Sequence, residues 1–374
     1  MSDIKPKWTK SDKTIVIVFN VGRGLAIFIR MPNNKCIIYD MGSSEDFSPA
    51  EVIKDEFIDT GYIKGVSQLF VSHPHKDHFQ ESDVMIGETI KQESIELITM
   101  PNFEDFNEED SVGRKNEKLD ETFLSQQMSE DDIKQYKAIY ADRQPPLCVV
   151  YADDKHDNSV NEDIECGLFY MRPPDVKEIH GESVQEYGNG TSLCFYYRHN
   201  KHVIWIQGDI TPEVMKKMIN ASSDEIERRF SHLKAANLQE NDSLYGYNPL
   251  RSGDNPYPSS LLSDADMRLI NVAPHHGLQS CYSEDFFAVA KPIVNIISES
   301  HGNNGTVDKR YSNHDKGVYV RSGEDCSQDT GGKRKSLTTR NDGHILMVLG
   351  SDGDPVFYHS TAIEQIINAM NELS

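Results

Sequence analysis

The seven residues from Ser72 to His78, Ser-His-Pro-His-Lys-Asp-His, constrain this chain more than any other stretch. They follow the apolar run Leu69-Phe70-Val71 and bring together three imidazoles and one carboxylate, those of His73, His75, Asp77 and His78. Imidazole nitrogen and carboxylate oxygen are the ligands that zinc and similar divalent metals prefer. Without a metal, the cost of crowding these groups is left uncompensated. The stretch therefore predicts a metal site; the alternative is a polar surface turn.

The length of 374 residues allows one large α/β domain with insertions, or two domains. We expect a single domain over 1–374 with its core at about 14–358. No run approaches the ~18 apolar residues of a membrane span, and the first residues lack the apolar stretch of a signal peptide. Six cysteines lie far apart without a C-x-x-C pair, which favours free thiols in a reducing cytoplasm. We therefore expect a cytoplasmic protein with no membrane contact.

The formal net charge of −22 disfavours indiscriminate binding to phosphate backbones, which need surfaces rich in Lys and Arg. A basic strip at Gly331 to Lys335 and bound metal ions would reverse the field locally. The acidic composition therefore disfavours long nucleic acids as substrates but does not exclude them.

Alternating apolar segments predict strands along most of the chain. The expected strands are 14–21, 25–31, 35–39, 66–71, 191–197, 201–207, 269–273, 292–297 and 344–349. Helices are expected after Pro49, after Pro212 and over 361–370. Open α/β sheets bind their ligands at the carboxyl ends of the strands in strand–helix–strand units, which is where the polar residues 72–78 lie.

Two insertions are expected, at about 104–160 and 221–263. The segment from Glu104 to Asp132 is strongly acidic and poor in large apolar residues, so we expect it to be exposed, either as a solvated flap or as a lid or protein-partner surface. Ser129 begins a capping-box-like sequence before a short helix.

Two later motifs complete a candidate site. Gly208-Asp209 ends one predicted strand, and Pro274-His275-His276-Gly277 follows another. Gly-Asp alone is a common turn. In this order, each at the carboxyl end of a strand, the three motifs together indicate one metal centre.

With these motifs the chain resembles the metallo-β-lactamase superfamily, and within it the β-lactamase-like domain of ComEC-type DNA-uptake proteins. Residues 72–78 resemble the superfamily signature. The further similar segments are Asn20 to Gly24 (D-V-G-Q-G in the branch), Ile37 to Gly42 (I-L-I-D-T-G), Asn189 to Leu193 (N-N-x-S-L), Ile206 to Asp209 (L-x-G-D), Ala273 to Gly277 (V-x-H-H-G) and Thr339 to Ile345 (T-D-x-x-G-x-I).

The resemblance implies an αββα sandwich with two divalent metal ions, zinc or manganese, at the sheet edge. It implies that His73 and His75 ligate the first metal, that Asp77, His78 and His276 ligate the second, and that Asp209 bridges both. His275 would contact substrate or donate a proton, although which member of the His275–His276 pair coordinates stays open. Asp40 would accept a hydrogen bond and orient a ligand.

The chain departs from the wider superfamily where a third histidine ligand is usual. Gly188-Asn189 stands there, as asparagine does in the ComEC-type branch, and His180, His199 or His202 could substitute. Asn20 and Leu25 replace two aspartates of that branch. We expect His199 and His202 to be exposed in a hairpin turn and His301, His314 and His344 to be surface or loop residues.

A pair of divalent metals implies hydrolysis by an activated water, with Asp77 and Asp209 orienting it. The resemblance favours a phosphodiesterase or nuclease, acting on a nucleotide or on short or single-stranded nucleic acid. Two alternatives stay open: a small-molecule acyl or lactone hydrolase, and a non-catalytic metal-stabilised module whose acidic insertions bind a protein partner.

Overall fold

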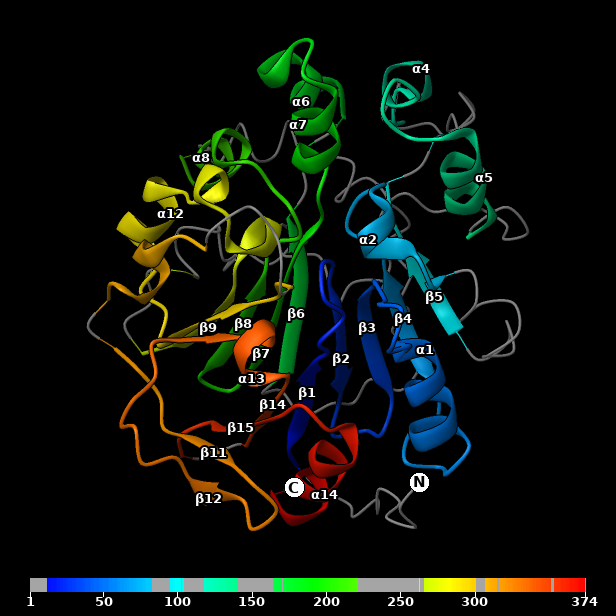
Figure 1. Ribbon diagram of the computed structural model, residues 1–374. Coiled ribbons are helices and arrows are strands. Elements are labelled where there is room, and N and C mark those ends of the chain that lie inside the picture. Colours follow the sequence, from blue (N-terminus) through cyan, green and yellow to red (C-terminus); the bar gives the residue numbers. More distant parts are fainter. Residues whose placement is uncertain are drawn as a thin grey trace, which may run out of the picture.

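The computed structural model describes residues 12–82, 95–101, 103, 118–139, 164–169, 171, 173–220, 262, 266–300, 307–314, 316–350 and 353–373. These residues form two β-sheets with helices around them, which confirms the predicted α/β class (Figure 1). The predicted insertion at 221–263 lies outside the described residues except for Leu262, as does His301.

The larger sheet has nine strands in the order β12-β11-β15-β14-β1-β2-β3-β4-β5. Their bounds are β1 Thr14–Val18, β2 Ala26–Arg30, β3 Cys36–Met41, β4 Val66–Phe70, β5 Ile95–Thr99, β11 Val320–Ser322, β12 Ser327–Gln328, β14 His344–Leu349 and β15 Val356–Ser360. β3, β4 and β5 run parallel, whereas β1 pairs antiparallel with both β2 and β14. The residues of β1, β2 and β3 are buried throughout, as expected for apolar, β-branched strands in the middle of a sheet.

The smaller sheet has six strands in the order β13-β10-β9-β8-β7-β6. Their bounds are β6 Ile164–Phe169, β7 Cys194–His199, β8 His202–Ile206, β9 Arg268–Val272, β10 Val294–Ile297 and β13 Ser336–Thr338. The parallel pairs β8–β9 and β9–β10 end at the same edge, because the carboxyl ends of parallel strands meet there.

The two sheets pack against each other through one hydrophobic core that contains residues of both. The Phe195 ring of β7 lies 4.6 Å from that of Phe70 in β4, and the Tyr39 hydroxyl of β3 donates to the Leu193 carbonyl. Leu193 N–H in turn donates to the Ser72 carbonyl over 2.9 Å. These contacts bring the loop after β4 in the larger sheet against the start of β7 in the smaller one.

Helices cover the outer sides of the sheets (Figure 1). Their bounds are α1 Pro49–Val52 with a π-helical turn Ile53–Ile58, α2 Lys76–Phe79, α4 Glu121–Leu124, α5 Glu130–Ala138, α6 Pro173–His180, α7 Val184–Gly190, α8 Pro212–Asn220, α12 Glu284–Val289, α13 Thr339–Asp342 and α14 Ile363–Leu373. The π-helical turn after α1 packs Phe57 against Phe28 of β2, with ring centres 4.7 Å apart. Among the described residues, no helix combines the length and apolarity needed to cross a membrane.

Of the acidic stretch from Glu104 to Asp132 that we expected to be exposed, the structure describes 118–132, and this part is only partly exposed. Ser129 caps α5 by accepting from Asp132 N–H, as predicted. However, Phe123, Leu124 and Tyr136 are buried in the common core. The Tyr136 ring meets Phe79 of α2 at 5.1 Å. The acidic side chains lie on the remaining faces of α4 and α5, so an acidic composition concealed an amphipathic helix pair.

Three histidines expected at the surface are buried. His199 and His202, which we placed in an exposed turn, each have 2% exposure, and His344 has 4%. His199 Nδ1 lies 3.1 Å from Thr14 Oγ1 between the sheets, and His344 Nδ1 accepts from Asn20 N–H. Partners from distant parts of the chain stabilise the rings of His199 and His344 in the interior.

Candidate metal centre

Three loops at the carboxyl ends of strands converge on one point between the sheets. The loop after β4 carries His73 and His75, and the single turn of α2 carries Asp77 and His78. Asp209 follows β8, and His275 and His276 lie in a short 3-10 turn after β9, Pro274–Gly277. The structure thus places together all the residues that the sequence named as metal ligands.

Ligand atoms from these loops lie close enough to share metal ions. His73 Nε2 is 3.1 Å from His75 Nδ1, His78 Nε2 is 3.2 Å from Asp209 Oδ1, and His276 Nε2 is 3.5 Å from Asp77 Oδ2. Two groups could each hold an ion: His73, His78 and Asp209, and Asp77, His78 and His276. Tetrahedral ligands about 2.0–2.1 Å from zinc are separated by roughly 3.3 Å, so this spacing fits.

The atoms that face this point are buried without hydrogen-bond partners. His78 Nε2, Asp209 Oδ1 and His276 Nε2 all belong to this class. Buried polar atoms are normally satisfied, and leaving one unsatisfied costs about 1–3 kcal/mol. Three such atoms aimed at one point are the arrangement that a cation would satisfy.

Asp40 orients His78 from behind. It is fully buried, and its carboxylate accepts from Ser72 N–H at 2.6 Å, from Ser72 Oγ–H at 2.8 Å and from His78 Nδ1 at 2.7 Å. Because Asp40 holds the proton on Nδ1, Nε2 is the atom that faces Asp209 and that is left to ligate a metal. The sequence-based expectation for Asp40 agrees with this geometry.

Glycines allow the backbone to close around α2. An added Cβ at either Gly24 or Gly42 would lie 2.3 Å from the carbonyl oxygen of Asp77. That carbonyl accepts from Leu25 N–H at 3.3 Å. The backbone of the Gly22-Arg23-Gly24 turn therefore helps to fix the position of Asp77.

Charges within the centre support one another. Burial opposes a charge on His78, yet Asp209 and Asp40 raise the His78 pKa well above its usual value. Burial likewise opposes the Asp209 charge, but His78, His275 and His276 lower its pKa. Burial lowers the pKa of His73, so this ring is neutral and its nitrogens can ligate. The centre thus presents anionic carboxylates beside imidazoles, as a divalent cation requires.

Gly188 and Asn189 lie in α7, at the position where the sequence resemblance led us to look for a third histidine. An added Cβ at Gly188 would lie 2.7 Å from His75 Nε2, so the absence of a side chain lets His75 lie against α7. The substitutes considered from the sequence lie elsewhere. His180 contacts Thr211 and Glu186, and His199 contacts Thr14.

His275 lies beside the centre with a different set of contacts. Its Nε2 is 3.7 Å from Asp209 Oδ2, while its Nδ1 lies 2.9 Å from Cys281 Sγ and 3.4 Å from Asn189 Nδ2. His275 and His276 both have positive φ, 47° and 57°, a conformation that non-glycine residues adopt rarely and mostly at constrained positions. Cys281 was not identified from the sequence, because a lone cysteine forms no motif.

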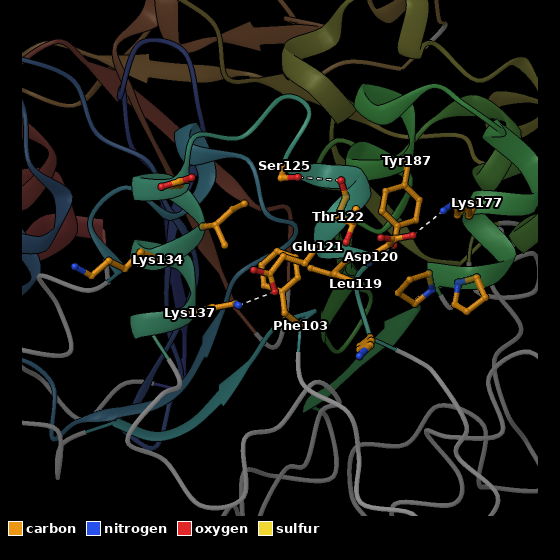
Figure 2. A pocket seen from close by; sticks show the side chains of 15 residues that line it. Phe103, Leu119, Asp120, Glu121, Thr122, Ser125, Lys134, Lys137, Lys177 and Tyr187 are labelled. Carbon is orange, nitrogen blue, oxygen red and sulfur yellow. Dashed lines mark hydrogen bonds and ion pairs between the residues drawn. The ribbon is translucent and has the colours of Figure 1, made fainter.

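A cavity of about 1010 Å³ lies between α4–α5 and α6–α7 (Figure 2). Its charged lining residues are four lysines, Lys118, Lys134, Lys137 and Lys177, and three carboxylates, Asp120, Glu121 and Glu130. Phe103 and Tyr187 add aromatic surface. Tyr187 immediately precedes Gly188, which abuts His75, so the cavity and the metal centre share α7. The opposite wall is tied to α2 through Lys76 and Asp132, whose charged atoms are 3.0 Å apart.

Comparisons with known proteins leave the family open. No protein-family model matches the chain, and no curated protein matches it. Among solved structures, a mutant of the CmlA beta-hydroxylase is similar with a TM-score of 0.28 and 12% identity, over 73% of this chain and 49% of that one. The chain spans about half the length of that protein. At this level the likeness identifies neither a family nor an activity.

Proposed function

We propose that the chain is a metal-dependent hydrolase with a metallo-β-lactamase-type αββα sandwich, and that its substrate is a phosphodiester. The proposal depends on the convergence of five candidate ligands, with His75 beside them, and on three buried atoms without hydrogen-bond partners that face one point. The sequence resemblance supports the fold type, and two packed sheets with outer helices are consistent with it.

The ligands divide into two sets. His73 Nε2, His75 Nδ1 and Asp209 would hold one ion, and Asp77, His78 Nε2, His276 Nε2 and Asp209 the other. Two divalent ions, which we propose to be zinc or manganese, would supply Lewis-acid polarisation of the electrophile and an acidified water. Imidazole and carboxylate ligands fit both metals.

The chain's own residues have separable tasks. Asp77 and Asp209 present carboxylate oxygens that can accept a hydrogen bond from the attacking water and orient it. Asp40 keeps His78 Nδ1 protonated. The Arg23 guanidinium lies 3.4 Å from Asp77 Oδ2 and is more than half exposed, so it can contact an anionic substrate from the solvent side.

A phosphate ester is preferred over an acyl or lactone substrate because of the cavity beside α7. Four lysines around one cavity stand out in a chain of net charge −22. Lys137 and Lys177 are paired with Glu121 and Asp120 at 2.6 Å, and Glu130 also lines the cavity. Four lysines against three carboxylates leave a small positive excess, which favours an anion. The volume of this open cavity is large enough for a nucleotide or the end of a single strand.

Metal-loaded protein tested on bis-p-nitrophenyl phosphate and on p-nitrophenyl acetate will decide between these substrate classes. We expect turnover of the phosphodiester, and its loss in Asp77→Ala and His75→Ala with folding retained. His359→Ala, in a half-buried histidine of β15 bonded to Asp329, is the matched control and should remain active. Turnover of the ester alone would replace the phosphodiesterase by an acyl hydrolase.

A non-catalytic partner-binding module is the remaining alternative. The apolar side chains of 118–139 are buried in the core, so less of the surface of this segment remains for contact with a protein partner. Stoichiometric metal with no activity on either probe, together with loss of an interaction when exposed acidic residues such as Glu130 are neutralised, would favour this alternative.

A further inference from the structure

His275 and His276 are neighbours with similar backbone conformations, yet their rings meet opposite kinds of partner. His276 Nδ1 lies 3.0 Å from the Ser298 carbonyl oxygen, which can only accept a hydrogen bond. His275 Nδ1 lies near the thiol of Cys281 and the amide nitrogen of Asn189, at 2.9 and 3.4 Å. Both of these groups carry hydrogens to donate.

We propose that Cys281 and Asn189 hold His275 in the neutral tautomer with its proton on Nε2, so that His275 donates a hydrogen bond to the substrate and neither ligates a metal nor transfers a proton. The role toward substrate rests on the proposed function, whereas the tautomer does not. Cys281 is a positioning residue in this scheme, because it acts only through His275.

The surroundings of Cys281 favour the thiol as donor. The side chain is buried with 5% exposure, and burial raises the pKa of Cys281 to about 12, so the sulfur keeps its hydrogen at neutral pH. An imidazole nitrogen that faces two donors must offer its lone pair to them. The single proton of the neutral ring is then on Nε2, the atom that points toward Asp209 Oδ2 at 3.7 Å.

The same reasoning assigns His276 the opposite task. A carbonyl at Nδ1 requires a proton there, which leaves the Nε2 lone pair free, and this atom is buried without a partner near Asp77 and Asp209. His276 belongs to one of the two groups that could hold an ion, whereas His275 belongs to neither. Adjacent histidines thus divide into a ligand and a hydrogen-bond donor.

The backbone makes the arrangement rigid. His275 N–H donates to the Gly208 carbonyl at 3.1 Å, which ties the ring to the turn that carries Asp209. His275 O accepts from Leu278 N–H, and Leu278 O accepts from Cys281 N–H, so two successive turns set the sulfur opposite Nδ1. A donor held in this way can stabilise the charge that develops on a substrate oxygen.

The tautomer can be measured directly by ¹⁵N NMR of histidine-labelled protein, with and without zinc, using His275→Ala to assign the signals. We expect a protonated Nε2 and an unprotonated Nδ1 for His275 in both states. In Cys281→Ala the signals should move toward a mixture of tautomers, and Cys281→Ser, which restores a donor, should return them. A protonated Nδ1 in the unaltered protein would overturn the proposal.

Asn189→Asp provides the opposite perturbation. A carboxylate in place of the amide can only accept at Nδ1, so the proton should move from Nε2 to Nδ1. An unchanged Nε2 proton in this variant would show that Asn189 does not set the tautomer and would refute its part in the proposal.

Kinetics on bis-p-nitrophenyl phosphate then test the role toward substrate. We expect Cys281→Ala to lower kcat on the order of tenfold at unchanged KM and metal content, with recovery in Cys281→Ser. His275→Ala should lower kcat about 100-fold or more while both metals stay bound. Cys326→Ala, a second buried cysteine far along the chain, is the control. Loss of a metal ion in His275→Ala would make this residue a ligand and refute the assignment. If the unaltered protein hydrolyses nothing, the proposed function fails, while the NMR result still decides the tautomer.

Discussion

Replacing Asp40 by Asn tests how far the metal centre depends on one buried hydrogen bond. Asp40 accepts three hydrogen bonds, from Ser72 N–H, from Ser72 Oγ–H and from His78 Nδ1. Asparagine has nearly the same shape and tolerates the positive φ of 58° at this position. Its oxygen can still accept from Ser72 N–H, but its NH₂ group then faces His78 Nδ1, where it would meet the ring proton.

His78 must respond by moving that proton to Nε2, which lies 3.2 Å from Asp209 Oδ1 and would otherwise ligate a metal. Loss of such an orienting partner typically costs 10–100-fold in metal affinity, or about 1.4–2.7 kcal/mol. Competition with a zinc chelator will measure the change for each ion.

Asp342→Asn is the matched control for Asp40→Asn. Asp342 is also buried, and it accepts from Arg334 and from Thr338 N–H, outside the candidate ligand sets. The control should lose stability without losing metal. Equal affinity for both ions in Asp40→Asn and the unaltered protein would refute the reasoning.

Three further outcomes follow from the structure. Gly188→Ala should displace His75, because the new Cβ would lie 2.7 Å from its Nε2, and bound metal measured by elemental analysis should fall from two ions to one. Metal binding should release a proton from His78, because Asp209 and Asp40 raise the pKa of this residue against the effect of burial. The affinity for metal should therefore weaken as the pH falls. Calorimetry in buffers of different ionisation enthalpy will measure the released proton, and its absence would contradict this prediction. Burial lowers the pKa of His344 to about 4, below its unfolded value near 6.5, so the unfolded chain binds a proton at this residue before the folded protein does. The free energy of unfolding should therefore fall by about 3 kcal/mol between pH 6.5 and 4. Urea unfolding of the His344→Gln variant should show this part of the pH dependence lost.

The strands and the ligand loops could be predicted because their signals are local. Apolar, β-branched runs marked β1 to β4 and β7 to β9, and the polar residues that follow them are the candidate ligands. The Ser129 cap was visible for the same reason. Each ligand motif could be recognised separately, although the motifs lie far apart in the sequence, because each one follows the carboxyl end of its own strand.

Features that depend on distant partners could not be predicted. His199 and His344 read as exposed because imidazoles are usually found where water can reach them, and only the fold supplies Thr14 and the Asn20 N–H as partners. The segment 118–139 read as solvated because its charge outweighs its apolar residues in composition, although those residues share one buried side. Cys281 has a role only because two turns of backbone bring it to His275.

The pairing of β1 with β14 has a consequence for how the protein is made. Thr14 lies opposite Leu349, so one side of β1 stays without its neighbour until ribosomes have translated the chain as far as β14. Such distant pairing slows folding and leaves a sheet edge open to other chains in the meantime. Chaperone demand during synthesis, rather than thermodynamic stability of the finished protein, should therefore limit its yield, and a truncation that ends before His344 should aggregate.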